Sequence, residues 1–164
     1  FQRYPIALLI VHPRVRTDYY RLPIRSEWFR YAAEHYSNPL CFNGGLTTVQ
    51  SCVQFAEEYP QINRLMIGQG LLSNPALVRQ AKGGPGLNRE ELRGFHDALY
   101  HTYLDLFASQ RNTVYHMKEL WNYLSCQFEG KENPLKRIRK AADSPSYESA
   151  VEQMFALPFH QESQ

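Results

Sequence analysis

The feature that most constrains the fold is an apolar run, residues 40–42, that stops abruptly at Asn43-Gly44-Gly45. Three consecutive apolar residues without alternation are typical of a parallel strand that is covered on both faces. The two glycines permit positive φ angles and close approach of a ligand, and Thr47 with Gln50 predicts a capped helix over 49–58. This order of strand, glycine turn and helix start leaves backbone N–H groups available to hold a phosphate.

The same arrangement occurs twice more along the chain. Residues 64–72 form a second apolar run that contains Gly68-Gln69-Gly70, and Asn74-Pro75 then predicts another helix start. Residues 6–11 form a third buried-strand run, which is followed by His12-Pro13-Arg14. Three strand-then-helix units with polar residues at the strand ends describe part of a (β/α)8 barrel, in which the ligand site lies at the carboxyl ends of the strands.

The second half of the chain changes entirely to a helical period. The cluster Lys82-Gly83-Gly84-Pro85-Gly86 is the one convincing linker, and Asn88 with Glu91 predicts a capping box after it. Apolar residues at spacings of three and four then form a stripe, namely Leu92, Phe95, Leu99, Tyr103 and Leu106. Similar patterns further on predict four amphipathic helices with short links, a four-helix bundle. The expected divisions are an α/β region over 1–84, an all-α region over 85–158 and a polar tail over 159–164.

Composition is that of a globular protein and says little about partners. A hydrophobic content of 43% supports a real core, and no apolar run approaches the length needed to cross a bilayer, so no membrane association is expected. The three cysteines, Cys41, Cys52 and Cys126, have no metal-ligand spacing, and their odd number favours a reducing cytoplasm over a disulfide framework.

The net charge of +2 is distributed unevenly. Residues 1–84 carry nine Lys and Arg against five Asp and Glu, whereas residues 85–164 carry nine against eleven. The basic excess therefore belongs to the half with the strand ends. It suits a polyanionic ligand and a solvated loop about equally well.

The same residues carry a resemblance to a known family. His12-x-Arg14 with Tyr20 and Trp28 downstream, Asn43-Gly44-Gly45, and residues 66–75 together resemble the last three barrel strands of the tRNA-dihydrouridine synthases. The order of these motifs and the intervals between them agree closely with those of the family, and the second half of the chain is helical, as it is in the family. The resemblance implies the C-terminal portion of a (β/α)8 TIM barrel followed by a helical tRNA-binding domain.

The resemblance also implies roles for particular residues. The family's His-x-Arg histidine lies against the flavin of bound FMN, which gives that role to His12. The backbone cradle for the FMN phosphate corresponds to Asn43, Gly44, Gly45, Gly68 and Gln69. Arg14 resembles the arginine that faces the substrate pocket. In the helical half, Arg111 and Lys118 resemble the contacts to tRNA phosphates, and the basic run 136–140 adds to them.

Ordinary structural roles compete with these functional ones. A lone histidine after an apolar run is more often a structural hydrogen-bonding residue, and a charged helix face is usually only solvated. Tyr115 and Trp121 are expected to be core residues rather than platforms for bases. The chain also departs from the family, because Gln69 and Val15 stand where arginine and threonine are usual. Backbone donors, rather than a charged side chain at 69, would then face the phosphate.

The resemblance further implies an activity for the parent protein. Such a protein uses NADPH to reduce FMN, and FMN to reduce a tRNA uridine to 5,6-dihydrouridine. The family's catalytic cysteine lies outside this chain, so no catalytic residue is expected here and the fragment alone is expected to be inactive. The residues do not indicate which uridine is modified.

The same residues leave two other functions open, and an incomplete barrel has one physical consequence. The chain also fits another FMN-dependent TIM-barrel oxidoreductase, although such an enzyme does not need a helix like 111–121, or a non-catalytic RNA-binding module. Three strands do not close an eight-stranded barrel and leave apolar faces and strand edges exposed. We therefore expect the isolated chain to self-associate through its exposed strands.

Overall fold

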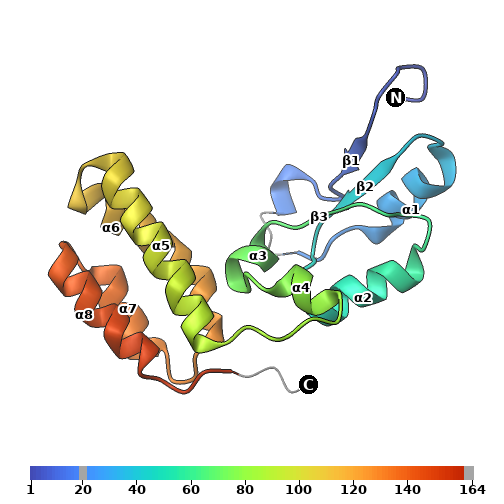
Figure 1. Cartoon of the computed structure of the whole chain (residues 1–164). Helices are drawn as coiled ribbons and strands as arrows, with labels where there is room; N and C mark the ends of the chain where they lie inside the picture. The colour runs from blue at the N-terminus through green and yellow to red at the C-terminus, as the bar shows by residue number, and fades with distance from the viewer. Residues whose placement is uncertain (19–21, 161–164) are drawn as a thin grey trace. The chain divides into compact units, whose positions relative to one another are not determined.

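The computed structural model describes residues 1–18 and 22–160. The chain divides into two compact units, Phe1–Leu71 and Leu72–Gln164 (Figure 1). The first contains the strands and the second is helical. Throughout the described ranges, no helix combines the length and the apolar character that crossing a membrane requires.

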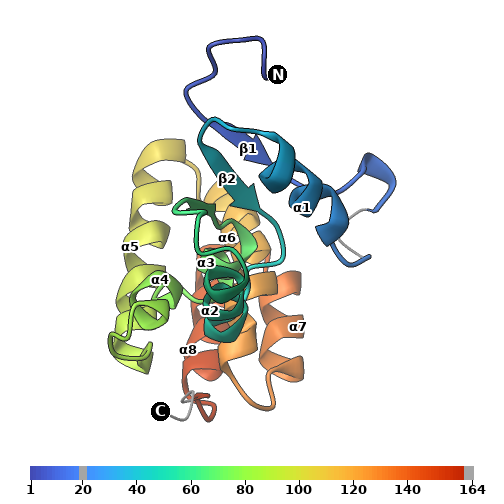
Figure 2. The same cartoon turned by 90° about the vertical axis from the view of Figure 1, so that its right-hand side faces the viewer.

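A three-stranded parallel sheet organises the first unit. Its strands are β1 (Leu9–Val11), β2 (Leu40–Asn43) and β3 (Leu65–Met66), in the order β1-β2-β3. Figure 2 shows β1 and β2 side by side, running in the same direction. The parallel arrangement that the apolar runs predict is thus confirmed. The third strand is shorter than its run, because the helix α3 (Gln69–Ser73) begins inside it.

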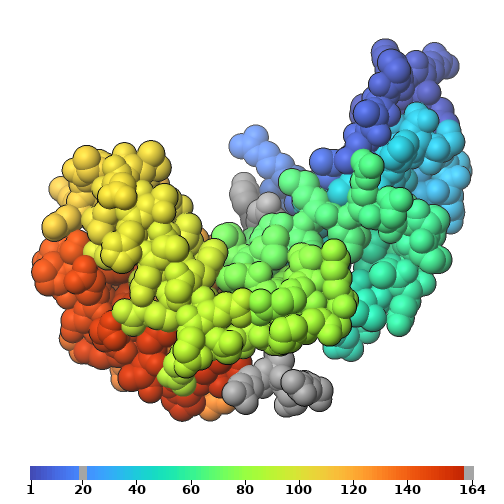
Figure 3. All heavy atoms as spheres, viewed as in Figure 1, coloured from blue at the N-terminus to red at the C-terminus, as the bar shows by residue number. Residues whose placement is uncertain are grey.

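Two helices pack on β2 through a cluster of aromatic rings. The helices are α1 (Ser26–His35) and α2 (Val49–Glu58), the second with the predicted bounds. The Phe42 ring of β2 lies 4.7 Å from the ring of Phe29 and 4.2 Å from that of Phe55, and all three side chains are buried. This packing fixes the end of β2, from which the glycine turn departs. Before β1, the N-terminal residues project from the unit (Figure 3), with Phe1 and Tyr4 exposed.

Side-chain caps determine where two of the helices begin. Thr48 caps α2 one residue later than predicted, and its hydroxyl accepts a hydrogen bond from the Ser51 N–H while the Ser51 hydroxyl accepts one from the Thr48 N–H. Asn88 caps the next long helix as predicted, by accepting a 2.8 Å hydrogen bond from the Glu91 N–H. The predicted reciprocal bond from Glu91 is replaced by an ion pair with Arg79.

Four long helices of the second unit share one apolar core. The fully buried side chains include Leu92, Met117, Trp121, Ile138 and Tyr147. Figures 1 and 2 both show α5, α6, α7 and α8 lying next to one another. The bounds in this unit are α4 (Leu77–Ala81), α5 (Arg89–Phe107), α6 (Gln110–Leu124), the 3-10 turn η2 (Ser125–Gln127), α7 (Glu132–Lys140) and α8 (Ser144–Phe155).

The predicted apolar stripe on α5 is only partly right. Leu92 is fully buried and Phe95, Leu99 and Tyr103 pack against the core, but Leu106 is 69% exposed. The buried positions that follow Leu92 are instead His96 and Tyr100. A polar histidine occupies the core side because it has hydrogen-bond partners there, the buried Tyr147 hydroxyl and the partly exposed Asp97 carboxylate.

The division between the units falls before the expected boundary after Gly84. Helix α4 belongs to the second unit, and Arg79 within it explains why. Its guanidinium pairs with the Glu91 carboxylate at 2.5 Å and donates hydrogen bonds to the carbonyl oxygens of Pro85 and Gly86. The linker is therefore folded against α4 and α5 rather than extended between two domains.

The start of the expected polar tail is attached to the helical unit. Phe159 pairs with Phe128 in an antiparallel bridge, with ring centroids 5.4 Å apart, and the His160 N–H donates to the Gln127 carbonyl oxygen at 2.8 Å. The remainder of that tail, residues 161–164, lies outside the described residues.

Candidate functional site

The carboxyl ends of β1, β2 and β3 open onto one cavity of about 560 Å³. Neighbouring parallel strands end at the same edge of a sheet, so residues that are distant in sequence come together there. A volume of this size is in the range of small-molecule sites. All the residues expected to serve flavin or substrate in this unit line the cavity, namely His12, Arg14, Asn43, Gly44, Gly45, Gly68 and Gln69.

The turn after β2 requires glycine for two reasons. Gly44 and Gly45 have φ angles of 147° and 67°, which L side chains rarely adopt. A Cβ on Gly44 would also lie 3.1 Å from Ile24 Cγ2 and 3.4 Å from the His12 ring. The backbone of this turn therefore comes close to His12, and the two together form one wall of the cavity.

The backbone at Gly68 faces open space instead. Apart from Gly68 itself and its two chain neighbours, no described atom lies within 4 Å of the place where a Cβ would stand on Gly68. Because Gly68 also lines the cavity, a ligand can approach its backbone from the cavity side. The glycines after β2 and β3 thus leave main-chain atoms accessible at two neighbouring strand ends.

The loop after β1 is ordered by a buried carboxylate. Asp18 is 2% exposed, and its oxygens accept hydrogen bonds from the Val15 N–H at 2.9 Å and from the Arg25 guanidinium at 3.2 Å. These bonds, the backbone one first, lower the pKa of Asp18. Arg14 donates to the Leu22 carbonyl oxygen, which holds the arginine at the cavity. Asp18 is not among the predicted site residues; its signal in the sequence is that it is the one acidic residue among the arginines of this loop.

Tyr20, which contributes to the family resemblance, lies outside the described residues. Trp28, the other aromatic residue of that motif, is 60% exposed on α1 and does not line the cavity. The apolar part of the cavity wall comes instead from the strands themselves. Ile10 and Met66 both line it and are 48% and 49% exposed. The cavity thus combines accessible backbone and the guanidinium of Arg14 with an apolar surface.

A second cavity, of about 550 Å³, lies on the helical unit between α6 and the end of α7. Arg111 and Lys118, the two expected phosphate contacts, both line it together with Lys140. Tyr115 lines it too and is 62% exposed, so its expected core position is wrong. It lies on the face of α6 opposite the core, whereas Trp121 is fully buried as expected.

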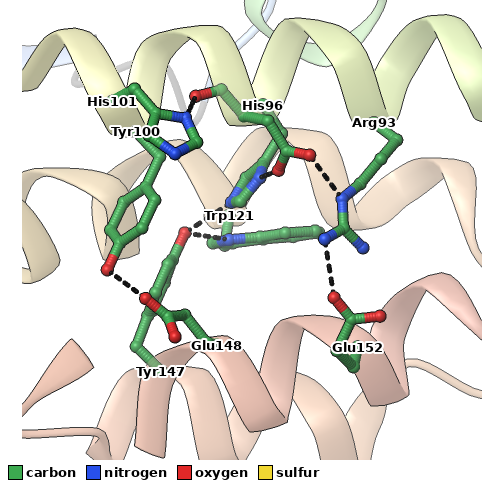
Figure 4. A network of polar contacts seen from close by, with 9 residues as sticks. Arg93, His96, Tyr100, His101, Trp121, Tyr147, Glu148 and Glu152 are labelled. Carbon is green, nitrogen blue, oxygen red and sulfur yellow. Dashed lines mark hydrogen bonds and ion pairs between the residues drawn. The ribbon is translucent and has the colours of Figure 1, made fainter. Parts of the chain in front are cut away.

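Sequence analysis also missed a buried polar network that joins three helices (Figure 4). His96 of α5 is 2% exposed, with Nε2 2.7 Å from the Tyr147 hydroxyl and Nδ1 2.8 Å from an Asp97 oxygen. Trp121 Nε1 donates to the same hydroxyl at 2.9 Å. The hydroxyl can therefore donate its own proton to Nε2, which leaves Nδ1–H to donate to Asp97.

Electrostatics keep this network neutral at its centre. Burial lowers the pKa of His96, although the neighbouring Asp97 opposes the shift, and burial raises the pKa of Tyr147. At the surface of the network, Arg93 pairs with Asp97 at 2.8 Å and with Glu152 of α8 at 2.6 Å. These contacts fasten α5 to α6 and α8, so the network has a structural role. Its signal in the sequence is the spacing of four residues that puts His96 on the buried face after Leu92.

None of the cysteines has the surroundings of a reactive thiol. Cys41 and Cys52 are buried, and burial raises the pKa of both and of Cys126. A raised pKa keeps a thiol protonated and weakly nucleophilic. Across residues 1–18 and 22–160, no three His, Cys, Asp or Glu side chains gather in a way that could hold a metal ion.

Comparison with known proteins gives a consistent result. The model of the family described as dihydrouridine synthase (Dus) matches residues 2–156. A tRNA-dihydrouridine(16) synthase of Neisseria meningitidis serogroup B is 24% identical over 142 residues, which cover 83% of this chain and 42% of that protein. A tRNA-dihydrouridine(16) synthase of Pseudomonas syringae pv. tomato is 34% identical over 74 residues, 45% of this chain and 23% of that protein. The chain thus spans less than half the length of these curated relatives.

Proposed function

The chain belongs to the dihydrouridine synthase family, and we propose that it forms the C-terminal part of an enzyme that reduces uridine 16 of tRNA to 5,6-dihydrouridine. The observation that carries this proposal is the convergence of His12, Asn43 and Gly68 on one cavity, since they come from the motifs of three successive strands. The names of the relatives support tRNA as the substrate and position 16 as the target.

We propose FMN as the cofactor of this cavity. The positive φ angles at Gly44 and Gly45 and the open space beside Gly68 suit a ligand that approaches main-chain N–H groups, as a phosphate does. Ile10 and Met66 offer an apolar surface for a planar ring. When bound, FMN supplies the hydride for the C5–C6 bond of uracil, and NADPH is its proposed reductant.

The residues around the cavity then have distinct tasks. His12 lies against the turn that would hold the phosphate, and its ring can donate a hydrogen bond to the bound group. Arg14 is held at the cavity by the Leu22 carbonyl oxygen, and we propose that it faces the substrate. The cysteine that protonates the uracil ring in this family is proposed to belong to a part of the enzyme outside this chain. The chain alone is therefore proposed to be inactive.

The proposed architecture follows from the same assignment. The sheet of β1, β2 and β3 supplies three strands of a TIM barrel, which other parts of the protein close, and α5 to α8 form a four-helix bundle. Free cysteines suit a protein of the reducing cytoplasm.

We propose that the cavity on α6 and α7 binds tRNA. Arg111, Lys118 and Lys140 converge on it, and the exposed ring of Tyr115 stands among them. Cations in such a group attract the phosphate backbone, and an exposed aromatic ring offers a stacking surface for an unpaired base.

The decisive experiment measures dihydrouridine by mass spectrometry after incubating the full-length protein with FMN, NADPH and an unmodified tRNA transcript. We expect the product at position 16, and no product from residues 1–164 alone. The variant His12→Ala is expected to lower kcat/KM at least about 10-fold, the equivalent of about 1.4 kcal/mol in transition-state binding. His35→Ala removes an exposed histidine of α1 that does not line the cavity, and should leave kcat/KM unchanged. Product from the chain alone would contradict its proposed incompleteness.

A further inference from the structure

We infer that the RNA surface extends beyond α6, over Lys140 and the turn at residues 141–142, to the start of α8, as one track for RNA phosphates. The inference rests on the proposed function and names where the bound RNA runs. The observation behind it is that two cavities, of about 550 and 390 Å³, share Lys140, Ala141 and Ala142. The first is lined from α6, and the second from α7 and α8, so the turn between α7 and α8 connects them.

The charges of the first cavity fit a polyanion. Lys140 joins Arg111 and Lys118 around it, and the polar side chain of Asn112 completes the polar part of the lining. Among the described residues that line this cavity, none is a carboxylate. Three cations without an opposing acidic group favour consecutive phosphates over a neutral ligand.

Within the basic run 136–140, Lys140 differs from the other cations in what it contacts. Arg137 donates to Gln153 Oε1 at 2.7 Å, and Arg139 donates to Asn122 Oδ1 at 2.8 Å, so both guanidinium groups hold neighbouring helices. Lys136 is exposed but lines neither cavity. Arg137 lines only the second cavity, whereas Lys140 lines both, which assigns to Lys140 the phosphate contact between them.

The second cavity is suited to continue the track. Its one carboxylate, Asp143, is the N-cap of α8 and accepts a 2.9 Å hydrogen bond from the Ser146 N–H. Ser149 and the shared, exposed Ala142 add small side chains to the lining. Arg137 and Lys140 also line this cavity, so its two cations outnumber its one carboxylate, which suits the continuation of an RNA backbone over the turn.

The test is the salt dependence of binding between the full-length protein and unmodified tRNA. The logarithm of the association constant falls linearly with the logarithm of the salt concentration. Removing one phosphate contact should make this line less steep by about 1. We expect this loss for Lys140→Ala, as for Arg111→Ala and Lys118→Ala. Lys136→Ala is the matched control, since it removes the same charge from the same helix and should leave the slope unchanged.

A second pair of variants tests the path beyond Lys140. Ala142→Glu should weaken binding by repulsion at low salt, whereas Ala142→Gln, of similar size, should weaken it much less. Equal effects of the Glu and Gln variants would overturn the extension to α8. If Arg111→Ala and Lys118→Ala lower the slope but Lys140→Ala does not, the inference fails while the proposed function stands. If none of the three changes the slope, the proposed RNA surface itself is wrong.

Discussion

Gly44 shows how a single residue determines the candidate cofactor site. Its φ of 147° is unfavourable for any L side chain, and a Cβ would press on Ile24 at 3.1 Å. We expect Gly44→Ala to cost about 1–3 kcal/mol of stability, measured by urea unfolding, and to weaken FMN binding, measured by flavin fluorescence. The matched control is Gly94→Ala, because Gly94 lies within α5 and, apart from nearby atoms of its own helix backbone, no described atom lies within 4 Å of its Cβ position. That variant should stabilise the chain by roughly 0.5–1 kcal/mol. Equal effects of the two substitutions would refute the argument.

At the same scale, the sequence predicts some site residues and misses others for a physical reason. Gly44 and Gly68 follow apolar runs and can be found from local pattern alone. Asp18 and His96 have weaker signals, as the one acid among the arginines of a loop and as the residue four positions after Leu92, because the burial of a polar side chain depends on partners that the fold brings to it. The hydroxyl that faces His96 belongs to Tyr147, which is 51 positions away. Tyr115 was placed wrongly because helical spacing does not say which of several aromatic residues faces the core.

Among the elements, regular helices were predicted best. The bounds of α2 agree with the prediction, and α5 begins at its predicted cap. The short helix α3 was missed because five residues provide no helical period, and the third strand was predicted too long for the same reason. Local pattern therefore identifies long amphipathic elements, whereas short ones at strand ends are determined by the surrounding packing.

The helix network around His96 predicts a pH-dependent stability of the helical unit. Burial lowers the folded-state pKa of this histidine, so between that value and the ordinary value of about 6.5 the unfolded chain binds the proton more tightly. Stability should thus fall as pH decreases below about 6.5, by at most about 1.4 kcal/mol per pH unit. Asp97 opposes the shift. Arg93, Glu152, Tyr147 and Tyr100, whose ring is stacked on the imidazole, are further titratable groups around it.

Urea unfolding between pH 7.5 and 5.5 measures this effect. Trp121 fluorescence reports the helical unit if exposed Trp28 is first replaced by Phe. Carboxylates with lowered pKa, such as Asp97 and Glu152, titrate at lower pH and do not interfere. His96→Gln should abolish the slope in this interval, and a slope that survives the substitution would assign the effect to another group.

For the whole molecule, the sheet of the first unit leaves strand surface uncovered. β1 and β3 are the outer strands of the described sheet, and Ile10, Leu65 and Met66 are between 36% and 49% exposed. Apolar outer strands with unpaired edges favour pairing with another chain. In the proposed enzyme, further barrel strands cover these edges, so exposure is a property of the chain by itself.

We therefore expect residues 1–164 alone to self-associate, with a weight-average mass that rises with concentration in sedimentation equilibrium. Leu65→Lys places a charge on an outer strand and should shift the chain towards monomer, because lysines on edge strands oppose pairing. Val53→Lys adds the same charge to the 40% exposed Val53 of α2, away from the strands, and should leave the association unchanged. A monomer at high concentration would show that these edges do not pair between copies. Equal dissociation by both lysines would indicate general charge repulsion rather than pairing through β3.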